Sequence, residues 1–384
     1  MTRRQFLILV AALAALAAVG AWIMQSQRTA WGPADSRIGQ RLVAGLKLED
    51  VAEVVLRDAS VTLTLVRRDG TWVVKQRADF PADAERVREL LLKLAELKIV
   101  QAEPVAEAQR ARLELAEPGA AAGTGAGTLL ELKDGTGKTM TRLLLGKKVT
   151  AKTAAEGPSP EEGVPTGRYV MSGIETGSVV LVSDPLGAAE AKPDAWLFKD
   201  LIRAEGVRSI IASGPDGKER FSLSRETDSY DWKLGGGGKP DLQKAQDALN
   251  PLQGMSLSDV VPDPGSAAAG LDRPIVIRAR TLDGVTYTLR VGSKTADDRY
   301  FIAISVSGEP ATARTAGKSE TAEEKEKQDK AFADNRAKLL EKLEREKKFE
   351  RWTYLVARTA VEPLLRERAQ LLPEKKPKDG KKRR

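Results

Sequence analysis

Alternating apolar and polar residues define the first folded part of the chain. The stretch TLVRRDGTWVVKQ (64–76) predicts two strands joined by a tight turn at Asp69-Gly70, with Trp72 opening the second strand. A similar pattern, FSLSRETDSYDWKLG (221–235), contains Trp232, which lies 160 positions after Trp72. The recurrence indicates that one domain is present twice.

Each of these hairpins is followed by apolar residues at helical spacing. The segment FPADAERVRELLLKLAELK (80–98) predicts a helix that starts near Pro81 and Asp83 and has one apolar face, made of Val87, Leu90, Leu91, Leu94 and Leu97. The segment PDLQKAQDALNPL (240–252) predicts the matching helix, with Leu242, Ala245, Leu249 and Leu252 turned inward. Because proline lacks an N–H, Pro251 is expected to break the last turn of this second helix.

The later strands also recur in the same order. LELAEP (113–118) corresponds to AGLDRP (269–274), and GRYVMSG (167–173) corresponds to DRYFIAIS (298–305). The first block is expected to close with a short helix at AWLFKDLI (195–202). We therefore predict an α+β protein with two tandem repeats, 47–202 and 205–372, each a mainly antiparallel sheet with one packed helix. Trp72 and Trp232, and likewise Tyr169 and Tyr300, are expected at equivalent positions.

The second block carries a charged insertion, 314–351, between two strands that should pair. Thr321–Arg351 is predicted to be a solvated helix supported by acid–base pairs four residues apart, namely Glu323–Lys327, Glu326–Lys330, Asp334–Lys338, Glu341–Arg345 and Glu344–Lys348. Phe332, Leu339, Leu340 and Leu343 give it a thin apolar stripe, which could dock on the domain or on a partner helix. The segment RWTYLVARTAVEPLLRERAQLL (351–372) is expected to supply the delayed strand and a closing helix.

The N-terminus contains nineteen uncharged residues, Phe6–Met24, after Arg3 and Arg4. A helix of this length spans about 28 Å, which is enough for a bilayer core. The arginines should hold the N-terminus in the cytoplasm, so that the chain after the anchor lies outside it. A cleaved signal peptide ending near Ala21 and twin-arginine export are the alternatives. The expected organisation is a cytoplasmic n-region and anchor (1–25), a stalk (26–46), the two repeats and a basic disordered tail (373–384).

Composition removes several kinds of chemistry. The 384 residues include no cysteine and no histidine, which excludes disulfides, thiol nucleophiles, Cys/His zinc sites and a histidine base. The net charge is +8, of which the last eleven residues supply +5, so that the rest of the chain is close to neutral. A basic tail of this kind is typically a solvated end, although it could contact anionic surfaces.

The apparent catalytic motifs fail on context. DGTGKT (134–139) lacks the first glycine of a phosphate loop and lies between two strands, and GTGAGT (123–128) precedes a strand. A Ser293-Lys294 dyad has no matching serine in the first block, where the sequence is Lys147-Lys148. We therefore predict no catalytic residue, no cofactor, no metal site and no enzyme activity.

Arg-Tyr pairs recur at Arg168-Tyr169 and Arg299-Tyr300. They could form a stacking and hydrogen-bonding site for a sugar or an anionic polymer. The structural alternative is a strand whose tyrosine faces inward and whose arginine faces solvent. Further candidate contact residues are Phe332, Leu339 and Leu343 of the charged insertion.

The hairpin RRDGTWVV, the helix segment 80–98, LELAEP before TLLEL, RLLLGKK and GRYVMSG resemble the bacterial family called domain of unknown function 4340 (DUF4340), in two copies. The resemblance implies a membrane-anchored protein that accompanies ABC-transporter or gliding-motility-type envelope components. We therefore expect a single-pass inner-membrane protein, mostly periplasmic, that acts as a scaffold or accessory subunit for an envelope protein partner. The alternative is a polysaccharide-binding module that uses the Arg-Tyr strands. Neither a nucleic acid nor a small-molecule substrate is expected.

Overall fold

The computed structural model describes residues 36–119, 125–150, 164–173, 178–314 and 320–374. It contains two compact units, one made of 1–62 and 88–191 and the other of 63–87 and 192–384. The predicted anchor, the first part of the stalk and nearly all of the basic tail lie outside the described residues. Among those that are described, no helix combines the length and the apolar composition needed to cross a bilayer.

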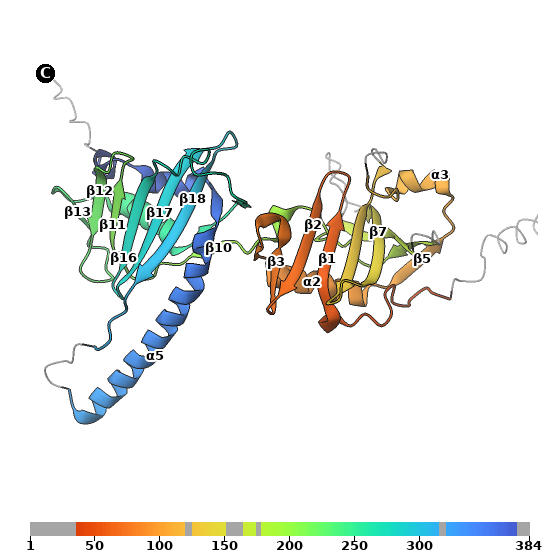
Figure 1. Ribbon diagram of the computed structural model, residues 1–384, viewed down its shortest axis with the longest axis horizontal. Helices are drawn as coiled ribbons and strands as arrows, with labels where there is room; N and C mark the ends of the chain where they lie inside the picture. The colour runs from red at the N-terminus through yellow and green to blue at the C-terminus, as the bar shows by residue number, and fades with distance from the viewer. Residues whose placement is uncertain (1–35, 120–124, 151–163, 174–177, 315–319, 375–384) are drawn as a thin grey trace, which may run out of the picture. The chain divides into compact units, whose positions relative to one another are not determined.

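The first large sheet has nine strands in the order β4-β3-β2-β1-β6-β7-β8-β9-β5. Figure 1 labels β1, β2, β3, β5 and β7 of this sheet. Its strands are β1 (Val51–Arg57), β2 (Thr62–Arg68), β3 (Thr71–Val74), β4 (Phe80–Pro81), β5 (Ile99–Glu103), β6 (Thr128–Asp134), β7 (Thr139–Thr150), β8 (Pro165–Ser172) and β9 (Ser178–Val182). The predicted hairpin of β2 and β3 is confirmed. Its turn residues Asp69 and Gly70 both have positive φ angles, as a type I′ hairpin turn requires.

The second large sheet has eight strands in the order β13-β12-β11-β16-β17-β18-β19-β15. They are β11 (Val207–Ser213), β12 (Glu219–Ser224), β13 (Lys233–Leu234), β15 (Asp259–Val261), β16 (Ile275–Thr281), β17 (Val285–Lys294), β18 (Arg299–Gly308) and β19 (Thr353–Ala357). A separate two-stranded sheet pairs β10 (Asp200–Ile202) with β14 (Met255–Ser256).

Few helices accompany these sheets. Within the described residues they are α2 (Ala84–Glu96), α3 (Glu107–Arg110), α4 (Leu242–Gln253), α5 (Ala322–Lys347) and α6 (Arg358–Val361), with short 3₁₀ turns between elements. The chain is therefore an α+β protein with mostly antiparallel sheets. The predicted delayed strand after the insertion is β19, and α6 with its 3₁₀ turns replaces a single closing helix.

The two large sheets have the same strand order apart from the extra edge strand β4. Read from β3 and from β13, the orders correspond strand for strand. The strand pairing shifts register at two matching places in each sheet. The first shift lies between Val51 and Glu53 of β1 and between Val207 and Ser209 of β11. The second lies between Leu145 and Lys148 of β7 and between Val291 and Lys294 of β17. A β-bulge is a specific local feature, so its recurrence at corresponding positions extends the correspondence from topology to register.

The two tryptophans lie at the starts of corresponding strands, Trp72 in β3 and Trp232 directly before β13. Trp72 directly precedes Val73, which pairs with Val66, and Trp232 directly precedes Lys233, which pairs with Ser224. Trp232 is buried, and the Arg225 guanidinium lies 4.6 Å from its ring centroid. Trp72 is only half-buried, so that Trp232 is the core residue of the two.

The predicted equivalence of Tyr169 and Tyr300 is wrong by one residue. The two tyrosines lie in corresponding strands, β8 and β18. However, Lys148 pairs with Arg168 whereas Lys294 pairs with Tyr300, so Tyr300 corresponds to Arg168 and Phe301 corresponds to Tyr169. The shared Arg-Tyr sequence suggested that Tyr169 and Tyr300 are equivalent. The register shift after Leu145 and Val291 instead makes Tyr300 equivalent to Arg168.

Helix α2 confirms its predicted apolar face, since Val87, Leu90, Leu91, Leu94 and Leu97 are all buried. Helix α4 departs from its prediction in two respects. Leu242 is 59% exposed, because the inward face begins one turn later at Ala245. Pro251 lies within the helix and does not break it, and its burial beside Leu249 and Leu252 offsets the one backbone hydrogen bond that a proline cannot make.

The short helix predicted for 195–202 does not form. A 3₁₀ turn, Pro193–Trp196, is followed by strand β10 (Asp200–Ile202), which pairs with β14. Trp196, Leu197, Leu201 and Ile202 are buried. The segment is too short to bury this density of apolar side chains on one helical face, and an extended chain buries them on two sides.

Candidate functional site

Helix α5 is the longest helix of the second unit and begins where the sequence predicts. Thr321 is its N-cap: the Thr321 Oγ1 accepts a hydrogen bond from the Glu324 N–H at 3.2 Å, and the Glu324 carboxylate accepts one from the Thr321 N–H at 2.9 Å. This reciprocal capping box satisfies two otherwise unpaired N–H groups. Hydrogen bonds from the Thr321 backbone and side chain lower the pKa of Glu324.

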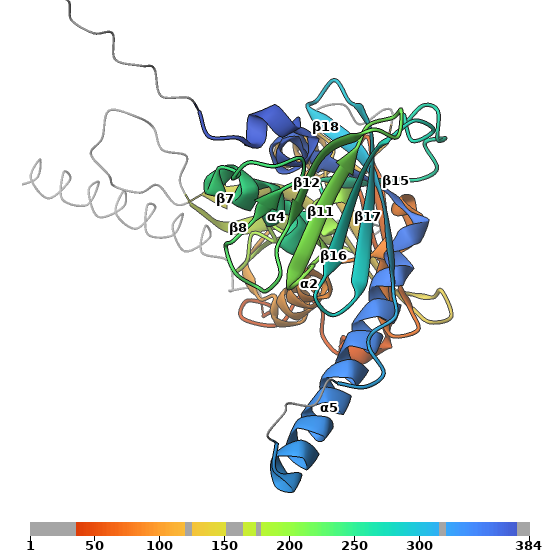
Figure 2. The ribbon, with the colours of Figure 1, turned by 90° about the vertical axis from the view of Figure 1, so that its left-hand side faces the viewer.

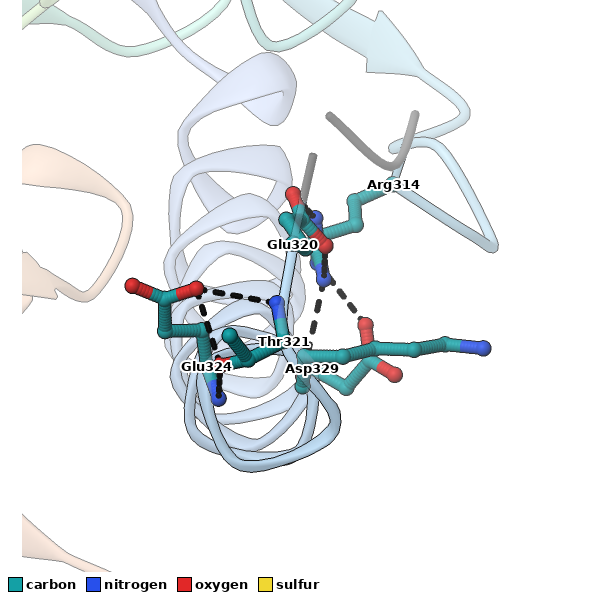
Figure 3. A network of polar contacts seen from close by, with 6 residues as sticks. Arg314, Glu320, Thr321, Glu324 and Asp329 are labelled. Atoms are coloured by element: carbon teal, nitrogen blue, oxygen red, sulfur yellow. Dashed lines mark hydrogen bonds and ion pairs between the residues drawn. The ribbon is translucent and has the colours of Figure 1, made fainter. Parts of the chain in front are cut away.

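The free end of α5 is fastened by Arg314, which lies in the segment leading from β18. Its guanidinium donates to both carboxylate oxygens of Glu320 at 2.6 and 2.5 Å and to Asp329 at 2.7 Å (Figure 3). These hydrogen bonds raise the pKa of Arg314. Bidentate pairing fixes direction as well as distance, so Arg314 holds the end of the segment after β18 against Glu320 and the first turns of α5.

Within the described residues, none of the five ion pairs predicted along α5 forms. Within the described part of the helix, Lys347 pairs with Glu344 at 3.0 Å, three residues away, and Arg314 pairs with Asp329 from outside the helix. Exposed pairs at i,i+4 contribute only about 0.2–0.5 kcal/mol each, so long exposed side chains gain little by adopting that geometry.

The base of α5 belongs to the core of the second unit. Leu343 is 4% exposed and Glu346 is 7% exposed. The Tyr287 hydroxyl of β17 donates to Glu346 Oε2 at 2.7 Å, and burial raises the pKa of both groups. The Lys342 ammonium donates to the Arg203 carbonyl at 2.6 Å. The helix is therefore anchored at one end and extends past the ends of β16 and β17 (Figure 2).

A groove of about 610 Å³ lies between α5 and the turn that joins β16 to β17. Phe332 and Leu339 line it from the helix, and Leu282 and Val285 line it from the sheet. Lys338 supplies a cation on the helix side and makes no ion pair within the described residues. Two predicted contact residues, Phe332 and Leu339, thus meet in one groove, while the third, Leu343, is a core residue.

In the first Arg-Tyr pair the arginine faces inward. This is the reverse of the structural alternative, in which the tyrosine faces inward and the arginine faces solvent. Arg168 is 8% exposed, and its Nε donates to the Gly146 carbonyl at 2.7 Å. Burial lowers the pKa of Arg168 to about 10. Tyr169 is half-buried against a cluster that includes Leu115 and Met171. The Arg168 guanidinium is therefore engaged inside the fold.

The second Arg-Tyr pair is more accessible. Arg299 is half-buried and pairs with Asp297 at 3.0 Å. Tyr300 lines a shallow groove together with Glu362 and Arg366. The two pairs belong to different units, and each has its own partners.

The buried Tyr287–Glu346 pair was not predicted. A glutamate near the end of a highly charged helix carries no signal of burial in the sequence. The one available hint was its spacing: Glu346 follows Leu339 and Leu343 on the thin apolar stripe. The described residues contain no group of three or more carboxylates placed to hold a metal ion.

We expect Glu346→Gln to stabilise the protein at pH 8 by about 1 kcal/mol and to have no effect near pH 4, because a neutral amide keeps the Tyr287 hydrogen bond without a buried charge. A carboxyl whose pKa is raised on folding contributes stability below its unfolded pKa and loses it as the pH rises through the folded pKa. Glu205 reinforces the raised pKa, whereas Lys342 and Arg345 oppose it. Urea unfolding at both pH values measures the difference, and exposed Glu341→Gln is the control. An equal effect of Glu346→Gln at both pH values would contradict the burial argument.

Comparison with known proteins gives a family and no activity. The family described as "Domain of unknown function (DUF4340)" matches residues 72–274, which is 203 of the 384 residues. The match is a single copy that runs from β3 to the residue before β16. No curated protein and no solved structure matches the chain.

Proposed function

The chain belongs to the DUF4340 family, and from this premise we propose that it is a membrane-anchored, extracytoplasmic scaffold or accessory protein whose helix α5 binds an envelope protein partner. The observation that carries the proposal is the groove between α5 and the β16–β17 turn. A helix held at its base by core contacts and at its tip by Arg314 is a rigid element for docking.

The chemistry of the groove indicates the kind of partner segment. Phe332, Leu339 and Leu282, the last of them 41% exposed, offer apolar contact, and Lys338 offers a cation beside them. A protein segment that places apolar side chains between helix and sheet and a carboxylate near Lys338 satisfies both. The resemblance to DUF4340 proteins adds the proposal that this partner belongs to an ABC-transporter or gliding-type envelope complex.

The matching strand orders and bulges support a second part of the proposal. We infer that the two sheets descend from one duplicated unit and that α5 was acquired by the second copy. In the first copy β8 passes directly to β9, whereas in the second α5 stands between β18 and β19. A duplicated scaffold in which one copy carries an arm is consistent with an accessory role.

The test shortens α5 without removing its base. The Arg336 Nε donates to the Ala311 carbonyl at 3.0 Å, so these two points are already adjacent and a linker of about three glycines should join them. We expect replacement of residues 312–335 to leave the second unit folded, because Leu343, Glu346 and Phe349 remain. Recovery of the partner from detergent-solubilised membranes should fall at least tenfold, by about 1.4 kcal/mol or more.

Matched controls separate a lost arm from a damaged fold. Exchange of two exposed charges on α5, in the variant Glu326→Lys with Lys330→Glu, keeps the helix and the net charge and should leave partner recovery unchanged. Leu339→Asp in the intact arm should reproduce the loss. The proposal fails if the shortened protein retrieves the same partner, or if the full chain is absent from the membrane fraction.

A further inference from the structure

The outer face of the second sheet carries three exposed arginines, Arg278 and Arg280 on β16 and Arg290 on β17. Residues alternate sides along a strand, and the intervening Ile277 and Ala279 are buried. Within the described part of the chain, none of the three arginines has an ion pair or a side-chain hydrogen bond. Together with their cross-strand neighbours they form the surface called the arginine face below.

Hydroxyl groups flank Arg280 on both sides. Its cross-strand neighbours are Ser209 on β11 and Thr286 on β17. The next strands place Ser224 beside Ser209 and Ser307 beside Thr286. Adjacent strands lie about 4.8 Å apart, so this row of one guanidinium and four hydroxyls crosses about 19 Å of the sheet.

A second row runs beside the first. Arg278 lies between Ile211 and Thr288, with Ser222 and Ser305 one strand further out. Arg290 continues the line of cations diagonally, between Val276 and Ala303. No cross-strand neighbour of the three arginines is acidic or aromatic.

The corresponding face of the first sheet is charge-balanced, which makes it an internal control. There Glu53 pairs with Lys133 at 2.8 Å, and Glu131 pairs with Arg142 at 3.1 Å. By register, Ser209 stands where the first sheet has Glu53, and Arg280 where it has Lys133.

The same comparison holds for the second row. Arg278 stands in place of Glu131, Thr288 in place of Arg142, and Arg290 in place of Leu144. Two acids and two bases in the first sheet give a net charge of 0, whereas these five positions in the second sheet give +3. Both acids are replaced, one cation is kept, one is lost and two are gained, so neighbouring side chains leave the charge uncompensated.

We propose that the arginine face binds an acidic polysaccharide, with the guanidinium groups pairing with its carboxylates and the flanking hydroxyls hydrogen-bonding its sugar hydroxyls. Arginine presents a planar fork that matches a carboxylate bidentately. The rows of serine and threonine supply hydroxyls that both donate and accept. Ser222 is the exception, because its Oγ already donates to Glu219 Oε1 at 2.6 Å. The three arginines lie on β16 and β17, and the Arg-Tyr strand β18 contributes Ser305 and Ser307, not Arg299 or Tyr300. The surface includes no residue of α5, so the inference does not rest on the proposed docking role.

Other polyanions fit the surface less well. Single-stranded nucleic acid is held by stacking of bases on aromatic side chains, and no cross-strand neighbour of the three arginines is aromatic. Trp352 lines the groove beside Arg290 but is only 7% exposed. Binding to a bilayer surface requires apolar side chains that insert, and the two rows contain a single one, Ile211. Acidic side chains stand at the margins, at Glu219 on β12 and at Asp263 and Glu350 in the groove beyond Arg290, and limit the binding surface to the central strands.

The experiment measures binding of the full-length, detergent-solubilised protein to immobilised polygalacturonate. We expect binding that weakens as the ionic strength rises and no binding to neutral dextran. The variant Arg278→Ser with Arg280→Ser and Arg290→Ser should lose at least tenfold in affinity, a change of about 1.4 kcal/mol. The variant Ser209→Glu with Arg278→Glu, which restores the acids of the first sheet, should lose at least as much.

The charge-matched control replaces three exposed lysines of the first unit, Lys47, Lys138 and Lys147, by serine, and its affinity should stay within about twofold. Thermal unfolding of each variant confirms that the fold is kept. The proposal is overturned if wild type does not bind polygalacturonate, or if the arginine variants bind as well as wild type. Equal or tighter arginine-dependent binding of a thymidine oligonucleotide or of anionic phosphatidylglycerol vesicles would overturn the assignment to a polysaccharide.

Discussion

Replacing Phe80 by alanine should destabilise the second unit by about 3–5 kcal/mol, the usual cost of deleting a fully buried aromatic ring. Phe80 has no exposed surface. Its ring lies edge-on to Trp352 at 4.9 Å and to Tyr354 at 5.9 Å between centroids, and Phe349 lies at 5.9 Å. Removing the ring leaves a cavity among large rigid side chains that cannot close by small rotations.

Other contacts make the same segment, 63–87, part of the second unit. The Arg77 guanidinium donates to both oxygens of Asp259 at 2.7 and 3.0 Å. The Trp352 Nε1–H donates to the Ala78 carbonyl at 3.0 Å. Loss of the Phe80 ring should therefore weaken a whole set of contacts between this segment and residues 192–384, and the effect should be cooperative.

Urea unfolding followed by tryptophan fluorescence reports on this unit, because all four described tryptophans belong to it: Trp72, Trp196, Trp232 and Trp352. Phe80→Leu keeps most of the volume and should cost less than about 2 kcal/mol. A cost below about 1 kcal/mol for Phe80→Ala would mean that the aromatic cluster is stable without it and that segment 63–87 contributes little to the second unit.

The elements that sequence predicts well are those whose signal is local and repeated. Helix α2 has its apolar residues at regular helical spacing, and all five of them are buried. The start of α5 follows from Thr321 and Glu324, which form the capping box that their spacing allows. The Asp69-Gly70 hairpin is equally local.

Prediction fails where long-range packing decides. Alternation along β8 could not show that Arg168 faces inward, because Gly167, Arg168, Val170 and Met171 are all buried and neither side of the strand faces solvent. The end of the 195–202 segment forms strand β10 because β14, more than fifty residues later, supplies its pair. Such partners have no local signature.

The candidate sites were likewise predictable only where their sequence signal is local. Phe332 and Leu339 were recognisable as apolar residues on a charged helix, and they do line a groove. The arginine face was not recognisable, because Arg278, Arg280 and Arg290 are separated in sequence. Only the pairing of β16 with β17 shows that they share one surface. The contrast with the first sheet becomes visible only once register assigns the equivalent positions.

Replacing Gly292 by alanine should destabilise the second unit by about 3 kcal/mol, at the upper end of what an overpacked site costs. A Cβ at this position would overlap the carbonyl oxygen of Ala269. That oxygen cannot easily move away, since it accepts a hydrogen bond from the Ser293 N–H at 2.8 Å. A backbone obstacle, unlike the end of a flexible side chain, leaves relief only through displacement of the strand or the loop.

The first sheet offers the matched experiment, because Gly146 occupies the corresponding position before the bulge in β7. A Cβ on Gly146 would overlap the carbonyl oxygen of Leu113. LELAEP and AGLDRP, which the sequence aligned, thus place Leu113 and Ala269 in the same role against the two glycines. We expect Gly146→Ala to lower the protection of backbone amides in β6–β8 against hydrogen exchange. Gly292→Ala should lower the protection of β16–β18 in the same way.

Gly135→Ala is the control, because a Cβ there meets no atom within 4 Å and its φ is not in the left-handed region. It should change stability by less than about 0.5 kcal/mol. Similar penalties at Gly146 and Gly292 would show that both sheets depend on the same close approach of a loop to a bulged strand, as expected for two copies of one unit. A large penalty at only one glycine would mean that the shared strand order does not extend to shared packing, and the duplication would then rest on topology alone.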